Sequence, residues 1–168
     1  MLLGLRVNFS YLPMQIDVDD LSRPEVHRLL EEHLANMYEW TPADRVFALD
    51  LKKLRVPEIT FWTAWDQEVL LGCGALKQLS PSHGEIKSMR TPLASRRKGA
   101  GRALLYHILQ EAEVRGYTTV SLETGSHLGF QVAQALYRSA GFEPCGPFGS
   151  YEENQHSVFM VRHSGTEA

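Results

Sequence analysis

Two glycines and four cations lie together in Arg96-Arg97-Lys98-Gly99-Ala100-Gly101-Arg102, directly before a run with helical spacing. The first N–H groups of a helix have no partner within the helix, and the helix dipole attracts anions to that end. Glycine lets the oxygens of an anion approach the backbone. Cations at a helix start are unfavourable by about 0.3–1 kcal/mol each, so a cluster of them indicates an anionic ligand. The stretch therefore predicts a phosphate site more than a solvated basic turn.

Two other phosphate motifs fit this stretch less well. A P-loop needs Lys and then Ser or Thr directly after its second glycine, and Arg102 follows Gly101 here. A dinucleotide-binding fingerprint needs a third glycine, where Leu104 stands, and an acidic residue at the end of the next strand. Glu123 lies near that distance, so this alternative is weakened but stays open.

Length and charge limit the kind of protein. The 168 residues fit one domain with a sizeable core, residues 1–168. The formal net charge is −3, and a negative chain is not drawn to nucleic acid or to an anionic membrane. We therefore expect neither of these partners. The basic cluster is local, which favours a small anionic ligand.

The cysteines and the first residues set further expectations. Cys73 and Cys145 lack the spacing of a zinc site or of a disulfide framework, so we expect no metal and a reducing, cytoplasmic setting. Residues 1–13 are apolar but lack the basic start of a signal peptide and the length of a membrane span. We interpret residues 1–13 as an N-terminal extension and residues 164–168 as a tail.

The spacing of apolar residues predicts the elements that position this loop. The expected strands are residues 14–18, 58–65, 68–76, 85–91, 118–123 and 157–162. The expected helices are residues 23–38 capped by Ser22, 41–54, a third that runs from the glycine-rich loop to Gly116, and 128–140. A strand–helix–strand crossover in the second half implies a parallel pair, whereas the hairpins imply antiparallel pairs. The expected fold class is α/β in the α+β sense, a mixed sheet with helices on both faces.

Two motifs in register carry a resemblance to a known family. Residues 96–101 match the Arg/Gln-x-x-Gly-x-Gly/Ala signature of the GNAT-superfamily N-acetyltransferases, at the same place between a strand and a helix. Residues 136–142, LYRSAGF, resemble the Leu-Tyr-x-x-x-Gly-Phe element of that family. The order of elements fits from about Met14 to His163, and the chain also resembles a bacterial subgroup of small acetyltransferases. The resemblance implies a partly antiparallel sheet of about seven strands that splays at a CoA site.

The resemblance also implies a cosubstrate, acetyl-CoA, and residues that hold it. The N–H groups of residues 97–102 would bind its pyrophosphate, and the backbone of residues 89–91 would bind its pantetheine. Many members carry Asn where Phe130 stands, so Ser126 or His127 would supply that polar contact. The expected cofactor-binding residues are Met89, Arg90, Thr91, Arg96, Arg97, Lys98, Gly99, Ala100, Gly101, Arg102, Ser126 and Phe130.

Acetyl transfer to an amine needs a base for the ammonium and a proton donor for the leaving sulfur. By resemblance, Tyr137 is the donor, although its helix pattern alone would place it beside an apolar stripe. Glu123, at the end of a strand, is the first candidate for the base. Glu85 is the second, and an ordinary strand-end charge is the more common role for it. His83 and His127 fit exposed loops better than a catalytic role.

Two questions about the acceptor site remain open in the sequence. Arg90 is charged within a strand, where it could pair with Glu123 or Glu85 or bind a carboxylate of the acceptor. Aromatic residues could line the acceptor pocket, although such residues are more often core. These aromatic residues are Tyr38, Trp40, Trp62, Trp65 and Tyr151.

The sequence thus favours an acetyl-CoA-dependent N-acetyltransferase with a small-molecule or amino-acid-like amine as acceptor, and no covalent enzyme intermediate. A protein N-terminus or lysine is a competing acceptor. A CoA-binding sensor without turnover is the alternative outside this class. A homodimer is compatible with the fold, but no signal for it is visible in the sequence.

Overall fold

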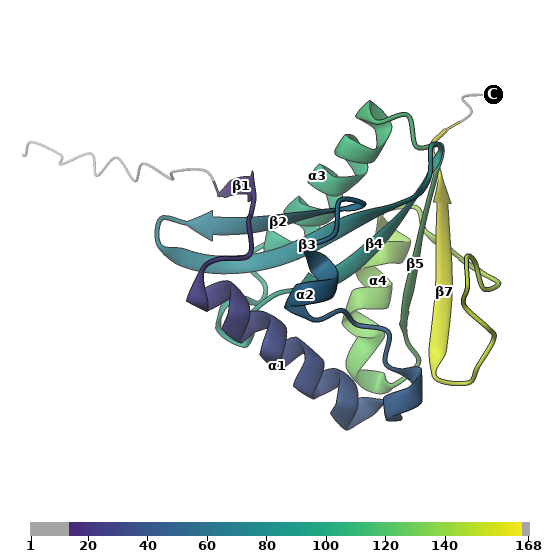
Figure 1. Cartoon of the computed structure of the whole chain (residues 1–168), viewed down its shortest axis with the longest axis horizontal. Coiled ribbons are helices and arrows are strands. Elements are labelled where there is room, and N and C mark those ends of the chain that lie inside the picture. The colour runs from purple at the N-terminus through teal and green to yellow at the C-terminus, as the bar shows by residue number, and fades with distance from the viewer. Residues whose placement is uncertain (1–13, 166–168) are drawn as a thin grey trace, which may run out of the picture.

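The computed structural model describes residues 14–165, so the expected N-terminal extension lies outside the described residues (Figure 1). The strands are β1 (Gln15–Val18), β2 (Ile59–Asp66), β3 (Val69–Ser80), β4 (His83–Arg90), β5 (Thr119–Gly125), β6 (Glu143–Cys145) and β7 (Ser157–His163). The α-helices are α1 (Pro24–Trp40), α2 (Leu51–Leu54), α3 (Ala100–Val114) and α4 (Gln131–Ser139). Short 3₁₀ turns are η1 (Ala43–Arg45), η2 (Leu93–Ser95) and η3 (Leu128–Phe130).

The seven strands form one sheet in the order β1-β2-β3-β4-β5-β7-β6. Within the described chain, β4 and β5 are the parallel pair and the other neighbours are antiparallel. The helix α3 connects β4 to β5, as a crossover between parallel strands requires. The mixed, largely antiparallel sheet that the sequence predicts is therefore confirmed.

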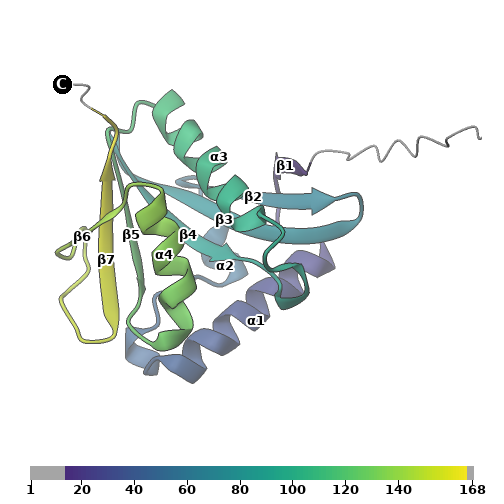
Figure 2. The ribbon, with the colours of Figure 1, turned by 180° about the vertical axis from the view of Figure 1, so that it is seen from behind.

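Helices cover both faces of the sheet, α1 and α2 on one and α3 and α4 on the other (Figures 1 and 2). Because side chains alternate along a strand, β2 sends Trp62 and Ala64 to the core under α3 and sends Phe61 and Trp65 to the core under α1. Each face therefore has its own apolar core, and the sheet between them is buried on both sides. Among the described residues, no helix combines the length and the apolar character needed to cross a bilayer.

The strands β4 and β5 pair along only part of their lengths. Their register runs from His83 opposite Thr119 to Ile86 opposite Leu122, and both strands continue beyond this point. An irregularity in the pairing with β3 falls in the same stretch of β4, where Ser88 has a φ of 54°. A bulge of this kind bends a strand away from its neighbour. The resulting gap is the splay that the sequence resemblance implies.

Two helix predictions are wrong in detail. Residues 41–54 do not form one helix: they form η1, a segment without regular secondary structure, and then the four-residue α2, whose Asp50 side chain accepts from the Lys53 N–H at 2.9 Å. Ser22 does not cap α1, because its hydroxyl donates to Asp20 and the cap position is Arg23, without a side-chain cap. Pro42 and Ser22 are common at helix starts, but nearby side chains and tertiary contacts decide these two segments.

The sequence also missed a strand and shortened others. The strand β6 has three exposed residues with Pro144 at its centre, and proline is tolerated at the edge of a sheet because no ladder bond is needed there. The strand β3 continues four residues beyond the predicted end at Leu76, so the expected loop shrinks to a tight turn at residues 81–82. The C-terminal glycine of α3 is confirmed, because Gly116 has a φ of 80°.

Candidate active site

The glycine-rich loop enters α3 through two left-handed residues. Arg97 has a φ of 65° and Gly99, at the cap of the helix, has a φ of 81°. A Cβ on Gly99 would meet no atom within 4 Å, so glycine is needed there for its backbone conformation and not for space. A Cβ on Gly101 would lie 3.5 Å from the Thr91 hydroxyl oxygen and 3.6 Å from a methyl carbon of Leu136. The missing side chain at Gly101 therefore leaves room between the loop, β4 and α4.

The turns of this loop leave a row of free donors. In the described chain, the N–H groups of Arg97, Lys98 and Gly99 have no acceptor, and the first helical bond is from Ala103 N to Gly99 O at 3.0 Å. Ala100, Gly101 and Arg102 are the first three residues of the helix, where N–H groups lack intrahelical partners. Six consecutive donors at the positive end of a helix dipole form an anion site.

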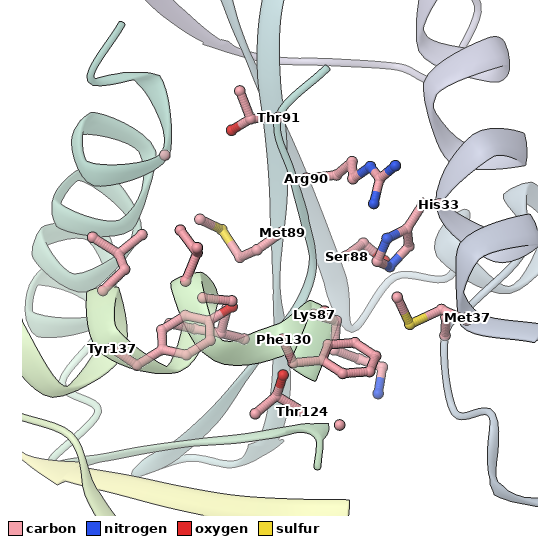
Figure 3. Close-up of a pocket in the computed structure, with 18 of the residues that line it drawn as sticks. His33, Met37, Lys87, Ser88, Met89, Arg90, Thr91, Thr124, Phe130 and Tyr137 are labelled. Carbon is pink, nitrogen blue, oxygen red and sulfur yellow. The ribbon is translucent and has the colours of Figure 1, made fainter. Parts of the chain in front are cut away.

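A cavity of ≈ 690 Å³ begins at this loop and reaches α1 through the gap between β4 and β5. Figure 3 shows how β4 divides its walls. Met89 packs near Ile108 and Thr91 approaches Gly101, so both face the loop and α3. Ser88 and Arg90 lie on the side that faces α1, next to His33. Arg96, Arg97, Gly99, Ala100, Gly101 and Arg102 line the loop end, whereas Lys98 is not among the lining residues.

Glu123 lies in the gap, on β5 beyond the last residue paired with β4. Burial raises the pKa of its carboxyl to about 7, and the nearby Glu85 charge acts in the same direction. The Ser157 hydroxyl and the Lys87 ammonium oppose this shift. A carboxylate with a pKa near the working pH is a far better base than an exposed one. The structure thus brings the first candidate base to the cavity with a suitable proton affinity.

Tyr137 extends from α4 toward β4 on the loop side of the cavity (Figure 3). Its ring is buried and packs edge-to-face on Phe142, with ring centres 5.9 Å apart. Burial, and secondarily the charge of Glu123, raises the pKa of the Tyr137 hydroxyl above its ordinary value. The hydroxyl therefore keeps its proton at neutral pH and can donate it in a hydrogen bond.

Glu85, the second candidate base, is not among the lining residues. Its carboxylate is buried, accepts from Lys87 Nζ at 3.1 Å, and accepts from the Tyr151 hydroxyl at 2.6 Å. Both bonds end on Glu85 Oε2, so this oxygen is already occupied by two donors. Lys87 itself lines the cavity.

Arg90 does not pair with Glu123 or Glu85, which was one of the two alternatives that the sequence left open. Its Nη2 donates to Glu32 at 3.0 Å and to Asn36, both on α1. The two partners precede Arg90 by more than fifty residues in the sequence, and only the packing of α1 on the sheet brings them together. Arg90 thereby lines the cavity on the side that faces α1.

The residues expected to replace the missing Asn lie in different places. Phe130 lines the cavity, and its ring covers Gly125 so closely that a Cβ there would lie 2.0 Å away. The Ser126 hydroxyl instead donates to the Gln155 carbonyl at 2.8 Å, outside the lining. His127 stacks on Trp40, and its Nδ1 accepts from the Gly129 N–H.

The aromatic candidates also separate. Trp40 lines the cavity, whereas Trp62 and Trp65 belong to the two cores, Tyr38 is exposed, and Tyr151 holds Glu85. The sequence reasoning missed several lining residues from the segment before α2 and from α1. These are His33, Met37, Arg45, Val46, Phe47 and Ala48. A polar His33 on the apolar face of a helix was the one local signal for this wall.

The described residues contain no cluster of three or more His, Cys, Asp or Glu side chains that could hold a metal ion. The functional groups of the cavity are backbone amides, cations, one carboxyl, one phenol, imidazoles and hydroxyls. This set suits the binding of an anion and the transfer of protons.

The comparisons with known proteins agree with this geometry. A model of the acetyltransferase (GNAT) family matches residues 22–142, which include the loop, the splayed strands and Tyr137. The chain belongs to the acetyltransferase (GNAT) family. It is an acyltransferase of the N-acetyltransferase type.

One relative and two solved structures show the extent of the similarity. The chain is 52% identical over 149 residues to the uncharacterized N-acetyltransferase YsnE of Bacillus subtilis. The matched region covers 89% of this chain and 99% of that protein. A crystal structure described as an acyl-CoA N-acyltransferase of Klebsiella pneumoniae has a TM-score of 0.75 and 26% identity, over 89% of this chain and 97% of that chain. A crystal structure of a Bacillus subtilis acetyltransferase in complex with CoA has a TM-score of 0.67 and 18% identity, over 90% of this chain and 99% of that chain.

Proposed function

We propose that this protein transfers the acetyl group of acetyl-CoA directly to an amine of a small-molecule or amino-acid-like acceptor. The observation that supports this most strongly is a single cavity that joins the free amides of the loop to Glu123 and Tyr137 in the strand gap. The free amides account for a phosphorylated cosubstrate, and the base and the proton donor account for amide formation. A protein N-terminus or lysine is the competing acceptor, and a sensor without turnover would need neither Glu123 nor Tyr137.

The residues present fit acetyl-CoA. Six free N–H groups in residues 97–102 suit a pyrophosphate, and Arg96, Arg97 and Arg102 add positive charge beside them. The gap beside residues 89–91 leads inward from the loop to Glu123 and suits an extended pantetheine arm. A structure of the same fold in complex with CoA supports this choice. Acetyl-CoA supplies an activated acyl group, whose carbon–sulfur bond breaks as a carbon–nitrogen bond forms.

We assign the base to Glu123, directly or through a water molecule. An amine attacks only when it is neutral, so the acceptor ammonium must first lose a proton. With its pKa near 7, the Glu123 carboxyl is ionised in about half of the molecules at neutral pH. It can take up the proton without prior rearrangement of the strands.

We assign to Tyr137 a hydrogen bond to the departing sulfur. The phenol stays protonated because burial raises its pKa, and the side chain extends from α4 into the loop side of the gap. A donor placed where negative charge develops lowers the barrier of the transfer step. Neither role requires an acyl-enzyme.

The test is an acceptor screen that follows the thiol released from acetyl-CoA, with mass spectrometry of the products. We expect at least one amine in a broad panel to be acetylated, at a rate that rises through pH 7. The panel includes peptides with free N-termini and with internal lysines. Acetylation of peptides alone would favour the competing acceptor. Binding of CoA without transfer to any amine or peptide would overturn the enzyme assignment.

A further inference from the structure

Three buried polar atoms in the cavity wall lack hydrogen-bond partners. They are His33 Nδ1, Ser88 Oγ and Arg90 Nε, and all three residues line the cavity. No other buried side-chain nitrogen or oxygen of the described residues is unpaired in this way. Buried polar groups are nearly always paired in folded proteins. Three exceptions in one wall of the proposed active site therefore indicate that a ligand completes the bonding.

The packing of α1 on β4 holds these three side chains together. Figure 3 shows them on the side of β4 that faces α1, away from Tyr137. Ser88 sits at the bulge of β4, and Arg90 is held by Glu32 and Asn36 through Nη2, which leaves Nε free. The Arg90 side chain is only 8% exposed. Small rotations about the side-chain bonds of Ser88, His33 and Arg90 would turn these polar atoms into the cavity.

The charges around the cavity are strongly unbalanced. Its one acidic lining residue is Glu123, whose pKa is raised, while the cations of the lining are Arg45, Lys87, Arg90, Arg96, Arg97 and Arg102. The last three lie at the loop, where a pyrophosphate would neutralise them. At the other end, each cation has a carboxylate neighbour: Glu85 for Lys87 at 3.1 Å, Glu32 for Arg90 at 3.0 Å, and Asp44 for Arg45 at 3.9 Å. A second anion there would therefore be held by directed donors, such as the free Arg90 Nε–H, more than by an excess of positive charge.

We propose that His33, Ser88 and Arg90 bind a carboxylate of the acceptor, so that the acceptor is an amino carboxylate such as an amino acid. This inference rests on the proposed function of the same cavity. Arg90 Nε–H and the Ser88 hydroxyl can both donate to carboxylate oxygens. Burial and the nearby Arg90 lower the pKa of His33 to about 4, so the ring is neutral and can add a third donor from Nδ1.

Matched substrates test this proposal without any mutation. The panel consists of α-, β- and γ-amino acids, their primary amides, and the same amines without the carboxyl group, with thiol release from acetyl-CoA as the readout. We expect kcat/KM to be about 10- to 100-fold higher for the best amino acid than for its amide, as a charge-assisted hydrogen bond implies. An equal or higher kcat/KM for the carboxyl-free amines would overturn the proposal and leave the proposed function standing. No transfer to any amine would overturn both.

Two variants then locate the carboxylate. In Arg90→Gln, we expect the ratio of kcat/KM for the amino acid to that for its amide to fall at least several-fold toward one, whatever happens to the overall rate, because the charged donor is lost and only His33 and Ser88 remain. In Glu32→Gln, the ratio should stay or rise, because Arg90 loses its competing partner. If Arg90 only anchored α1 to β4, both variants would leave the ratio unchanged, and the proposal would be wrong. Arg90→Lys, which keeps the charge, should retain part of the preference even if Arg90→Gln is poorly folded.

Discussion

The two ends of the cavity are built in opposite ways. The loop end consists of consecutive residues, 96–102, and its donors are backbone N–H groups held by two left-handed residues. The α1 end consists of side chains from separate elements, and His33 and Arg90 are brought together only by packing. A site built from backbone N–H groups can bind the same ligand even when the side chains around it vary. A site built from side chains can change its ligand when a single residue is substituted. The loop end therefore suits a constant cosubstrate and the α1 end suits a variable acceptor.

The largest effect is expected where the two ends meet, at Glu123. Glu123→Gln removes the proposed base, and general base catalysis contributes roughly 10²–10⁴-fold. We expect kcat/KM at pH 7 to fall at least about 100-fold, with a smaller loss at higher pH, where more of the acceptor amine is already neutral. In the unmodified protein, kcat/KM should rise as the pH increases through about 7, and this bend should vanish in the variant.

Initial rates between pH 5 and 10 check this prediction. Glu143→Gln, on the exposed strand β6, serves as the matched control and should behave like the unmodified protein. A persistent bend near pH 7 in Glu123→Gln would place the base elsewhere.

A smaller effect is expected on the loop side of the gap. Tyr137→Phe keeps the ring that packs on Phe142 but removes the proposed donor to the departing sulfur. We expect kcat to fall about 10- to 100-fold with little change in KM, because the hydrogen bond strengthens only as the bond to sulfur breaks. Steady-state kinetics measure this split, with Tyr106→Phe on the exposed face of α3 as the control. Unchanged kcat would mean that another group protonates the sulfur.

Glu123 should also affect stability, with a definite sign. The pKa of its carboxyl is raised from 4.5 to about 7 by folding, so the folded state is stabilised relative to the unfolded state only while Glu123 is protonated. The resulting penalty is absent below about pH 4.5, grows as the pH rises, and is complete above about pH 7. At 1.36 kcal/mol per pKa unit, it amounts to up to about 3 kcal/mol.

Glu123→Gln should therefore raise the free energy of unfolding at pH 8 but not at pH 4. Urea unfolding at the two pH values measures the difference. If the substitution changed the free energy of unfolding equally at pH 4 and pH 8, the folded protein would not favour the neutral form of Glu123.

The smallest effect concerns the geometry of the loop end. Gly99→Ala forces a side chain into the left-handed region at a φ of 81°, at a cost of about 1–2 kcal/mol, although no atom lies within 4 Å of the added carbon. Gly101→Ala lies in the first helical turn and should cost nothing in stability. Thermal unfolding of the two variants compares them, and equal melting temperatures would contradict the conformational role of Gly99.

The same contrast explains what the sequence could predict. The loop, its helix and Tyr137 were predictable because their signals are local: consecutive residues and fixed spacings. The parallel pair of β4 and β5 followed from the crossover through α3. The actual partners of Arg90 could not be predicted, because Glu32 and Asn36 belong to a helix that is distant in the sequence.

Two local patterns were overridden by tertiary contacts. Thr41-Pro42 is typical of a helix start, yet residues 46–50 form neither helix nor strand, and Phe47 lies in the cavity wall with its ring centre 5.1 Å from that of Tyr151. The strand β6 pairs through three residues that include Pro144, too few for a periodic signal. The two errors lie at the α1 end of the cavity and at the sheet edge, where the chain depends on neighbours far away in the sequence.

The claim that the loop end holds the cosubstrate is tested most directly by calorimetric titration of CoA into Gly101→Asp. The added carboxylate would point into the space between Thr91 and Leu136, beside the free amides. Gln110→Asp, which places the same charge on the exposed face of α3, is the control. We predict that Kd for CoA rises at least about 100-fold in Gly101→Asp and stays unchanged in Gln110→Asp. An unchanged Kd in a folded Gly101→Asp protein would contradict the assignment of the loop as the pyrophosphate site.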